Sequence, residues 1–283
     1  MKGGGSMNTP PPLGLIAGNG RFPFLVAAAA RRAGRRVVAV AVKEEASPDL
    51  AGSVDEMHWV GLGQLGHCID VLKAGGVSEA VMAGQVQHRR IFSGIVPDLK
   101  LAGVLVRLAV KNTDSLIGGV ADALSREGIT LLPSTALLED QMATAGAMSR
   151  RKPGGGERKD IAYGVKVARA LSALDLGQTV VIKDRAAVAL EAMEGTDEVI
   201  RRAGRLAGAG TTVVKLAKPR QDMRFDVPVV GTRTLEAMRE AGARTLAVEA
   251  GRTLLLDRAA VLEAADAGGI ALWGIGPEAM AAE

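Results

Sequence analysis

The chain has few aromatic residues and a single cysteine, and both shortages exclude whole classes of protein. Phe, Trp and Tyr together make up 2% of the 283 residues. Proteins that bind single-stranded nucleic acid stack its bases on such rings, so we expect no nucleic-acid partner. One cysteine, Cys68, excludes an internal disulfide and a cysteine-rich zinc site. These features fit a cytoplasmic protein.

Long apolar runs and the best-known catalytic motifs are missing as well. No apolar run approaches the roughly 20 residues that span a bilayer, so we expect any membrane contact to be peripheral. Neither Gly-x-x-x-x-Gly-Lys-Ser/Thr nor Gly-x-Ser-x-Gly occurs, which disfavours a P-loop enzyme and a serine hydrolase. His58 and His67 have no acidic partners at metal-ligand spacing, and His88 begins a short basic run that we interpret as solvated.

What the chain does have is a large supply of small and aliphatic residues. Hydrophobic residues make up 48% of it, and glycine occupies 36 positions. This composition suits helices packed closely on parallel strands and predicts an α/β fold. Apolar runs predict strands at 13–17, 36–42, 79–83, 129–132, 179–182, 187–193, 213–217, 246–249, 253–256 and 270–273. Helices are predicted at 23–33, 64–73, 99–110, 114–126, 161–174, 197–206, 232–241 and 258–267. Thr196 is the predicted N-cap of the helix at 197.

The order of these segments predicts two α/β domains. Residues 7–148 begin with a strand, a loop, a helix and a second strand, which is how a Rossmann-like, doubly wound sheet opens. Residues 149–160 combine charge with proline and glycine and lack apolar periodicity, so we predict a linker there. Residues 161–283 then form the C-terminal α/β domain.

The segment from Val213 to Gly231 carries the strongest sign of chemistry. Its apolar run is followed at once by a dense charged stretch, which Pro219 and Pro228 bracket and stiffen. The polar members of this charged segment are Lys218, Arg220, Gln221, Asp222, Arg224 and Asp226. On composition alone the charged segment is either a solvated loop with mutual salt bridges or a compact site for phosphate and metal.

Three other polar loops also follow predicted strands. The loop 18–22 precedes a helix N-terminus, where backbone N–H groups and the helix dipole attract anions. Pro23 stands where a dinucleotide fingerprint needs its third glycine, so a dinucleotide site is disfavoured. The remaining loops are 84–86 and 194–197. Each fits either a structural turn or cap, or a place in the crevice where the ends of parallel strands meet.

The order and spacing of these loops resemble those of a known family. Segments 13–23, 84–86, 194–197 and 218–228, followed by 247–251 and 254–257, are similar to those of the LpxI family of UDP-2,3-diacylglucosamine pyrophosphatases. The resemblance covers about residues 13–275. Gly18-Asn19-Gly20 departs slightly from the Gly-Gly-Gly form of that loop.

The resemblance implies hydrolysis of UDP-2,3-diacylglucosamine to UMP and 2,3-diacylglucosamine 1-phosphate (lipid X), a step of lipid A biosynthesis. It implies a divalent metal, usually Mg²⁺, and two α/β domains, the second with a mixed sheet, that hold the ligand in a cleft between them. It also implies a homodimer that works at the cytoplasmic face of the inner membrane. The essential acidic role carries over to Asp226, with Asp222 as the second candidate.

The residue types support the same chemistry. Mg²⁺ usually takes one or two carboxylates together with substrate phosphate, which suits Asp226 with either Asp222 or Asp197, while the neighbouring cations suit phosphate oxygens. The predicted substrate-binding residues are Gly18, Asn19, Gly20, Arg21, Phe22, Gly84, Gln85, Thr196, Asp197, Lys218, Arg220, Gln221 and Arg224. The rival hypotheses are a non-catalytic regulator that binds a nucleotide or lipid, and a nucleotide-sugar-modifying transferase or oxidoreductase.

Overall fold

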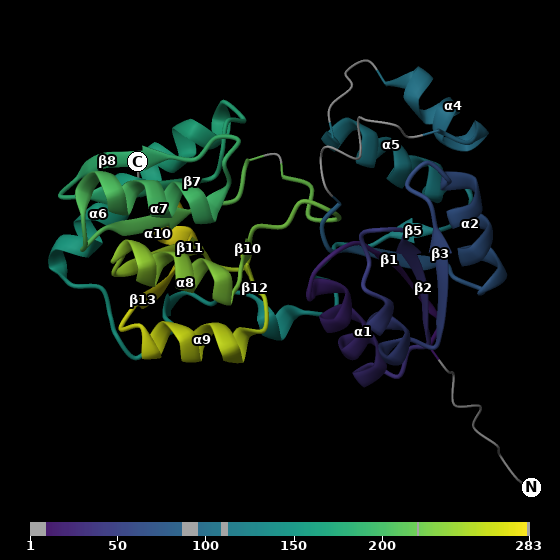
Figure 1. The fold of residues 1–283 in the computed structure, drawn as a ribbon, viewed down its shortest axis with the longest axis horizontal. Helices are drawn as coiled ribbons and strands as arrows, with labels where there is room; N and C mark the ends of the chain where they lie inside the picture. The colour runs from purple at the N-terminus through teal and green to yellow at the C-terminus, as the bar shows by residue number, and fades with distance from the viewer. Residues whose placement is uncertain (1–9, 87–95, 109–112, 220, 282–283) are drawn as a thin grey trace, which may run out of the picture. The chain divides into compact units, whose positions relative to one another are not determined.

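A computed structural model describes residues 10–86, 96–108, 113–219 and 221–281 of the chain. The chain divides into two compact units, which we call the first and the second unit. The first unit runs to Leu138 and also contains Met223–Phe225, and the second contains Glu139–Asp222 and the residues from Asp226 onward. Figure 1 labels their helices and strands.

A parallel five-stranded sheet forms the centre of the first unit. Its strands lie in the order β3-β2-β1-β4-β5, and every pairing is parallel. They are β1 Leu13–Ala17, β2 Val37–Val42, β3 Glu56–Val60, β4 Glu79–Ala83 and β5 Thr130–Leu131. This order is that of a Rossmann fold without its sixth strand and confirms the prediction of a Rossmann-like N-terminal sheet.

Helices cover both faces of the first sheet because its strands are apolar on both sides. The helices are α1 Phe22–Arg32, α2 Leu65–Ala74, α4 Leu99–Arg107 and α5 Thr113–Arg126 (Figure 1). Val38, Val40 and Ala80 pack in one hydrophobic cluster with side chains of α2, α4 and α5. α1 contacts β1, β2 and β4 and contributes no side chain to that cluster, so it covers the opposite face.

The second unit is built on a mixed six-stranded sheet, as predicted. Its strand order is β6-β13-β11-β9-β7-β8, in which β13, β11 and β9 are parallel and the three others pair antiparallel. The strands are β6 Gly146–Ala147, β7 Thr179–Lys183, β8 Ala186–Leu190, β9 Thr212–Lys215, β11 Thr245–Glu249 and β13 Ala271–Ile275. β10 Val229–Val230 and β12 Leu254–Leu255 form a separate parallel pair.

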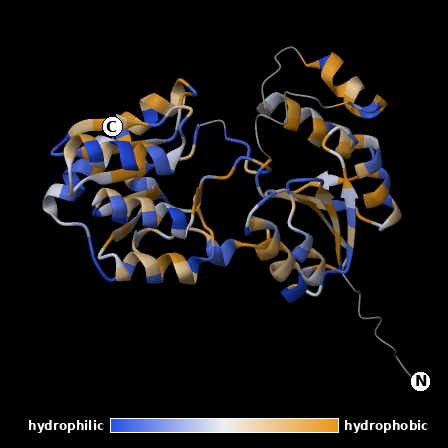
Figure 2. Ribbon diagram, viewed as in Figure 1, coloured by the Kyte–Doolittle hydropathy of each residue, from blue (hydrophilic) through white to orange (hydrophobic). Residues whose placement is uncertain are grey.

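Alternate residues of the central strands feed two separate cores in the second unit. Val213 and Leu246 pack against α7, α8 and α9 on one face, whereas Val214 and Ala247 pack against α6 on the other. The helices are α6 Gly155–Ala173, α7 Thr196–Ala207, α8 Thr232–Ala241, α9 Arg258–Ala267 and α10 Pro277–Ala281. In both units hydrophilic and hydrophobic residues mix along the helices, as the amphipathic patterns predict (Figure 2). Among the helices of the described residues, none is long and apolar enough to cross a membrane.

The predicted linker at 149–160 differs from what the structure shows. These residues lie within the second unit, and residues 155–160 form the beginning of α6. Gly154 N–H donates to Glu157 Oε2, and Arg151 pairs with Glu157 at 2.6 Å while donating to the carbonyl of Arg244. Side-chain bonds therefore order a stretch whose lack of apolar periodicity indicated a linker.

One further prediction of local structure was wrong, and one strand was not predicted. Gly195, with φ of 82°, is the N-cap of α7, so Thr196 is the first helical residue and not the cap. The sequence also gave no indication of β3, where only Val60 is buried and the other side chains are partly or fully exposed. An edge strand of that kind has little of the apolar signal on which the strand predictions rest.

Candidate active site

Two polar loops of the first unit are joined by their main chains where β1 and β4 end. Asn19 N–H donates to the carbonyl of Gln85 at 2.8 Å, and Gln85 N–H donates back to Asn19 at 3.1 Å. Gly18 N–H donates to the carbonyl of Ala83 at 2.9 Å. The predicted substrate loops 18–22 and 84–85 are thus brought together, but the N–H groups of Gly18 and Asn19 are used inside the protein. The predicted anion attraction cannot depend on those two groups.

Glycine is required where these loops touch. A Cβ at Gly18 would lie 2.5 Å from the carbonyl oxygen of Gln85, and one at Gly84 would lie 2.5 Å from that of Asn19. Gly84 also has φ of 93°, a conformation that disfavours other residues. The side chains of Asn19, Arg21 and Gln85 are exposed, whereas Phe22 opens α1 half-buried. The joined loops therefore form a fixed main-chain platform that presents polar side chains.

Arg224 of the charged segment belongs to this first unit. Ser134 N–H donates to the carbonyl of Met223 at 2.9 Å, and Ser134 Oγ lies 2.7 Å from the carbonyl oxygens of both Arg224 and Met82. Ser134 is buried and follows β5, while Met82 lies in β4. Residues 223–225 are thus fixed at the same ends of the strands as the joined loops.

Asp222 and Asp226 flank that tripeptide and belong to the second unit. Asp226 N–H donates to the carbonyl of Asp222 at 2.9 Å, which closes one turn of chain. The two predicted acidic residues are therefore one turn apart. Arg220, the remaining predicted cation of the charged segment, lies outside the described residues.

Side-chain bonds hold the start of the charged segment. Lys218 Nζ lies 2.6 Å from Asp175 Oδ1, and Lys218 N–H donates to Gln221 Oε1 at 2.7 Å. The buried carboxylate of Glu249, at the end of β11, accepts a bond from Ala217 N–H at 3.0 Å and lies 3.4 Å from Arg252. Lys218 and Gln221 thus follow β9, which ends at Lys215 and not at the predicted residue 217.

A buried polar cluster lies at the end of β9, and we call it the Lys215 cluster: Lys215, Thr196, Glu191 and Thr179. Lys215 Nζ donates to Thr196 Oγ1 at 2.9 Å, and Thr196 Oγ1 donates to Glu191 Oε1 at 3.0 Å. Thr179 Oγ1 lies 3.2 Å from Thr196 Oγ1 and donates to it when the Thr196 proton points to Glu191. The predicted residue Thr196 is thus the centre of the Lys215 cluster.

Carboxylates surround this lysine. Burial lowers the pKa of Lys215 below its ordinary value, and the negative charges of Glu191, Asp197 and Asp226 partly oppose that shift. Asp197 follows Thr196 in the first turn of α7 and accepts a bond from Thr234 Oγ1 of α8 at 3.1 Å. The N-terminal turns of α7 and α8 thus hold Asp197, and the negative charges of Asp197 and Asp226, two predicted residues, act on the same cation.

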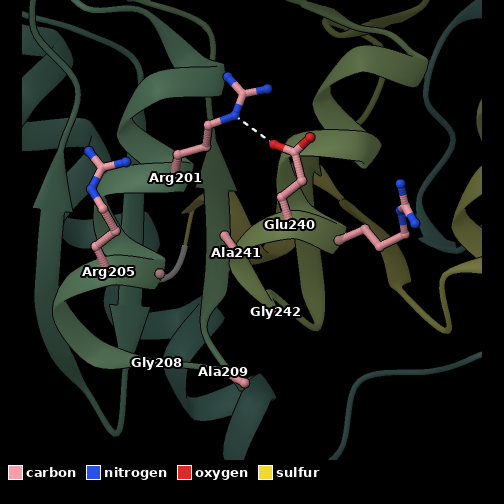
Figure 3. Close-up of a pocket in the computed structure, with 9 residues that line it drawn as sticks. Arg201, Arg205, Gly208, Ala209, Glu240, Ala241 and Gly242 are labelled. Carbon is pink, nitrogen blue, oxygen red and sulfur yellow. Dashed lines mark hydrogen bonds and ion pairs between the residues drawn. The ribbon is translucent and has the colours of Figure 1, made fainter.

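A separate hollow of about 530 Å³ lies at the opposite ends of α7 and α8 (Figure 3). Arg201, Arg205, Arg239 and Glu240 are among its lining residues, and Arg201 donates to Glu240 at 2.7 Å. Cations there complement the carbonyl ends of the two helices. The hollow contains none of the predicted site residues and is not part of the candidate site.

Comparison with known proteins decides the family. Family models of the LpxI N-terminal domain and the LpxI C-terminal domain match residues 12–141 and 144–273. A protein of Caulobacter vibrioides, UDP-2,3-diacylglucosamine pyrophosphatase LpxI, is 32% identical over 277 residues, which are 94% of this chain and 98% of that protein. The chain belongs to the LpxI family. The two LpxI family domains meet between residues 141 and 144, close to the division of the structure after Leu138.

The residues of this LpxI member fit Mg²⁺ in one specific way. The described residues contain no group of three or more His, Cys, Asp or Glu side chains that could hold a metal ion. Asp222 and Asp226, one turn apart, offer the one or two carboxylates that Mg²⁺ takes when phosphate oxygens of a substrate complete its coordination. The donor set therefore fits a metal that binds together with a phosphate compound.

Sequence reasoning missed Lys215 and Glu191, although one signal was present. Lys215 interrupts the apolar run Val213–Ala217, and a lysine inside a buried strand needs a partner. Glu191 gave no comparable signal, because its position beside Thr196 depends on the pairing of β8 with β7. Lys215 comes from a strand whose pairing joins distant parts of the chain, whereas Glu191 follows β8, which forms a local hairpin with β7.

Proposed function

We propose that this chain hydrolyses the pyrophosphate of UDP-2,3-diacylglucosamine to UMP and 2,3-diacylglucosamine 1-phosphate. The name of the Caulobacter relative, UDP-2,3-diacylglucosamine pyrophosphatase LpxI, supports the substrate. The observation that carries the chemistry is the convergence of Asp197 and Asp226 on the buried cation Lys215 at the end of β9. A main-chain turn brings Asp222 next to Asp226. Buried charges of both signs in one place are typical of a site that binds a charged substrate.

Asp226 and Asp222 would hold Mg²⁺ in this proposal. When bound, the metal supplies positive charge for the phosphate oxygens and acidifies a water molecule. Lys218 and Arg224 bind phosphate oxygens, and their positive charge reduces the repulsion that an incoming water meets. Water adds its oxygen to one phosphorus, the bridging P–O bond breaks, and the bridging oxygen leaves with the other phosphate.

The joined loops of the first unit carry polar groups of the kinds that such a substrate needs. Asn19, Arg21 and Gln85 have exposed polar side chains on a main-chain platform that glycine geometry fixes. Arg224 is fixed to the same strand ends through Ser134. These donors suit the polar uridine, sugar and phosphate groups of the substrate.

Exposed apolar side chains support a lipid substrate. Leu174 is 71% exposed and Leu176 is 56% exposed, and both neighbour Asp175, the partner of Lys218. Met193 is 98% exposed and lies two residues after Glu191 of the Lys215 cluster. The two short segments adjoin, since Gln178 N–H donates to Glu191 Oε2 at 3.2 Å. We propose that these side chains contact the acyl chains and the cytoplasmic surface of the inner membrane.

Release of UMP tests the proposal. Purified protein is incubated with UDP-2,3-diacylglucosamine with and without Mg²⁺, and UMP is measured. Release of UMP that requires the metal supports hydrolysis. Tight binding without turnover contradicts it and supports the rival hypothesis of a regulator. Hydrolysis in water labelled with heavy oxygen then locates the attack: we expect the label in the lipid phosphate, and label in UMP would contradict attack at the sugar-side phosphorus.

A further inference from the structure

Three arginines from two helices line the hollow at the C-terminal ends of α7 and α8, which we call the arginine hollow. Arg201 and Arg205 lie one turn apart on the same face of α7, and Arg239 belongs to the last turn of α8. Figure 3 shows Arg201 and Glu240 directed toward one another, with Arg205 on the same helix as Arg201. The volume of about 530 Å³ is within the range of small-molecule sites.

Small residues bring α7 and α8 close together at the arginine hollow. A Cβ at Gly204 would lie 2.7 Å from the Cβ of Ala241, and one at Gly242 would lie 2.8 Å from the Cβ of Ala209. Gly242 also has φ of 68°, which favours glycine. All four residues line the hollow. The packing of the two helices therefore fixes its shape and leaves room between the long arginine side chains.

The helix ends have hydrogen-bond partners that do not include these arginine side chains. At the end of α7, Lys183 Nζ donates to the carbonyls of Ala207 at 2.6 Å and Ala209 at 2.9 Å. At the end of α8, Ala243 N–H donates to the carbonyl of Met238 at 2.8 Å, as in a Schellman motif. The helix dipoles favour cations here in general, but capping does not explain three arginines.

Two of the three arginines lack a partner. Arg201 donates to Glu198 at 2.8 Å and to Glu240 at 2.7 Å. Among the described residues, in contrast, nothing forms a hydrogen bond or an ion pair with the guanidinium group of Arg205 or Arg239, and both residues are exposed. Cations that share one hollow repel one another, and an anion between them relieves that repulsion.

The charges of the arginine hollow favour an anion despite the negative helix ends. The two carboxylates bonded to Arg201 exceed its charge by one. Arg205, Arg239 and Lys183, which is bonded to Ala209 of the lining, add three positive charges. Each helix end contributes only about half a negative charge. A positive excess therefore remains in the hollow.

A phosphate group suits this excess better than a carboxylate does. A phosphate monoester carries close to two negative charges and has three terminal oxygens, so it can accept bonds from two guanidinium forks at once. A carboxylate has one charge and two oxygens, which a single fork saturates. Arg205 and Arg239, from different helices, thus have the chemistry of a phosphate clamp.

We propose that the arginine hollow is a second anion site, which binds a phosphate group through Arg205 and Arg239 and in which the phosphate displaces Glu240 from Arg201. The site shares no residue with the one proposed for hydrolysis, and UMP release tests that function separately. A soluble phosphate and the headgroup of an anionic lipid present the same chemistry, so the experiment includes both.

Protection from an arginine reagent tests the site in the unaltered protein. Phenylglyoxal modifies exposed guanidinium groups, and mass spectrometry of the peptides measures the reaction at each arginine. Inorganic phosphate at about ten times its dissociation constant should slow the reaction of Arg205 and Arg239 about 10-fold, relative to sodium chloride of equal ionic strength. Arg233 is the internal control, because it is an exposed arginine of α8 that does not line the hollow. Its reaction should not change.

Lipid vesicles provide the second arm of the experiment. Protection by inorganic phosphate supports a site for a soluble anion. Protection by vesicles of phosphatidylglycerol, but neither by vesicles of phosphatidylcholine nor by inorganic phosphate, supports a site for a lipid headgroup. Absence of protection in both arms would overturn the proposal, as would equal protection of Arg233, which would mean that the arginines are merely solvated charges.

Variants show whether the arginines share one ligand. Arg205→Met should raise the concentration of the protecting ligand that half-protects Arg239 by about 10-fold, because a charge-assisted bond is lost. Glu240→Gln should lower that concentration, since Arg201 is then available. Arg233→Met is the matched control and should leave it unchanged. Unaltered protection of Arg239 in the Arg205→Met protein would contradict a shared phosphate. If Arg205→Met does not fold, the protection pattern of the unaltered protein decides.

Discussion

The two units hold their polar loops in opposite ways. In the first unit the loops at the ends of β1 and β4 are joined by main-chain bonds, and glycines allow the close approach. In the second unit the loops are held by side-chain hydrogen bonds, namely those of the Lys215 cluster, Asp197 and Glu249. Buried polar residues follow the same division: those described in the first unit are Glu45 and Ser134, and the second holds many more.

This difference implies that the first-unit loops depend on their main chain for stability, whereas the second unit contains the side chains proposed for chemistry. A main-chain platform keeps its shape whatever side chains it presents. Folding therefore does not constrain the side chains of Asn19 and Gln85, which can serve binding. A buried charge cluster costs stability unless its members remain paired, and such clusters persist mainly where they perform a function. We therefore expect variants of the platform glycines in the first unit to act mainly on folding, and variants of the charged residues proposed for chemistry in the second unit to act mainly on turnover.

The largest expected effect is on turnover, from a substitution in the second unit. Asp226→Asn removes the negative charge with little change of shape, and turnover should fall by about 1,000-fold, equivalent to about 4 kcal/mol of transition-state stabilisation. Steady-state release of UMP measures it. Asp184→Asn, in the exposed turn between β7 and β8, is the control and should leave turnover unchanged. Near-normal turnover of Asp226→Asn with Mg²⁺ present would remove Asp226 from the mechanism.

The next largest effect is expected on the free energy of unfolding, from a variant that disrupts the main-chain platform of the first unit. Gly84→Ala places a Cβ 2.5 Å from the carbonyl oxygen of Asn19 at φ of 93°, and we expect a loss of about 3 kcal/mol in the free energy of unfolding. Gly20→Ala is a matched control, because Gly20 has the same φ but no atom within 4 Å of the added Cβ. Its cost should be about 1–2 kcal/mol, from the backbone conformation alone.

Urea unfolding measures both glycine variants. The difference between them isolates the close approach of the two loops, since the backbone strain is common to both. Equal losses in Gly84→Ala and Gly20→Ala would show that the loops separate at no cost. The description of a fixed platform would then be wrong.

The contrast between the units also explains which features the sequence could predict. β1 and β4 have the predicted bounds, 13–17 and 79–83, because an apolar run is a local signal. The pairing of Asn19 with Gln85 and the environment of Lys215 arise from residues far apart in the chain, and no local pattern encodes them. The charged segment was recognised, but its division between the units, with Met223–Phe225 in the first, follows from the buried Ser134.

A smaller effect concerns the lipid part of the proposed substrate. Leu174→Ser with Leu176→Ser removes apolar surface beside Asp175 and Lys218, and KM for the diacylated substrate should rise by about 10-fold with kcat little changed. Leu206→Ser is the matched control, since Leu206 is 66% exposed but lies at the other end of α7 from Thr196. Equal changes of KM in the two proteins would contradict a role of Leu174 and Leu176 in binding acyl chains.

The smallest expected effect is on the Tm, from the loss of a charge contact within the first unit. This contact involves none of the residues proposed for hydrolysis. Glu127 bonds to Lys100 of α4 and to Lys73 of α2, the latter at 2.9 Å, and these two bonds lower the pKa of Glu127 from 4.5 to about 2. A carboxyl with a lowered folded pKa stabilises the protein above pH 4.5, and that contribution is lost as the pH falls from 4.5 to 2. The Tm difference between the unaltered protein and Glu127→Gln should therefore shrink over this range and shrink again in 1 M salt, because both lysines are about half exposed and screened. A difference independent of pH and salt would mean that Glu127 acts through packing and not through its charge.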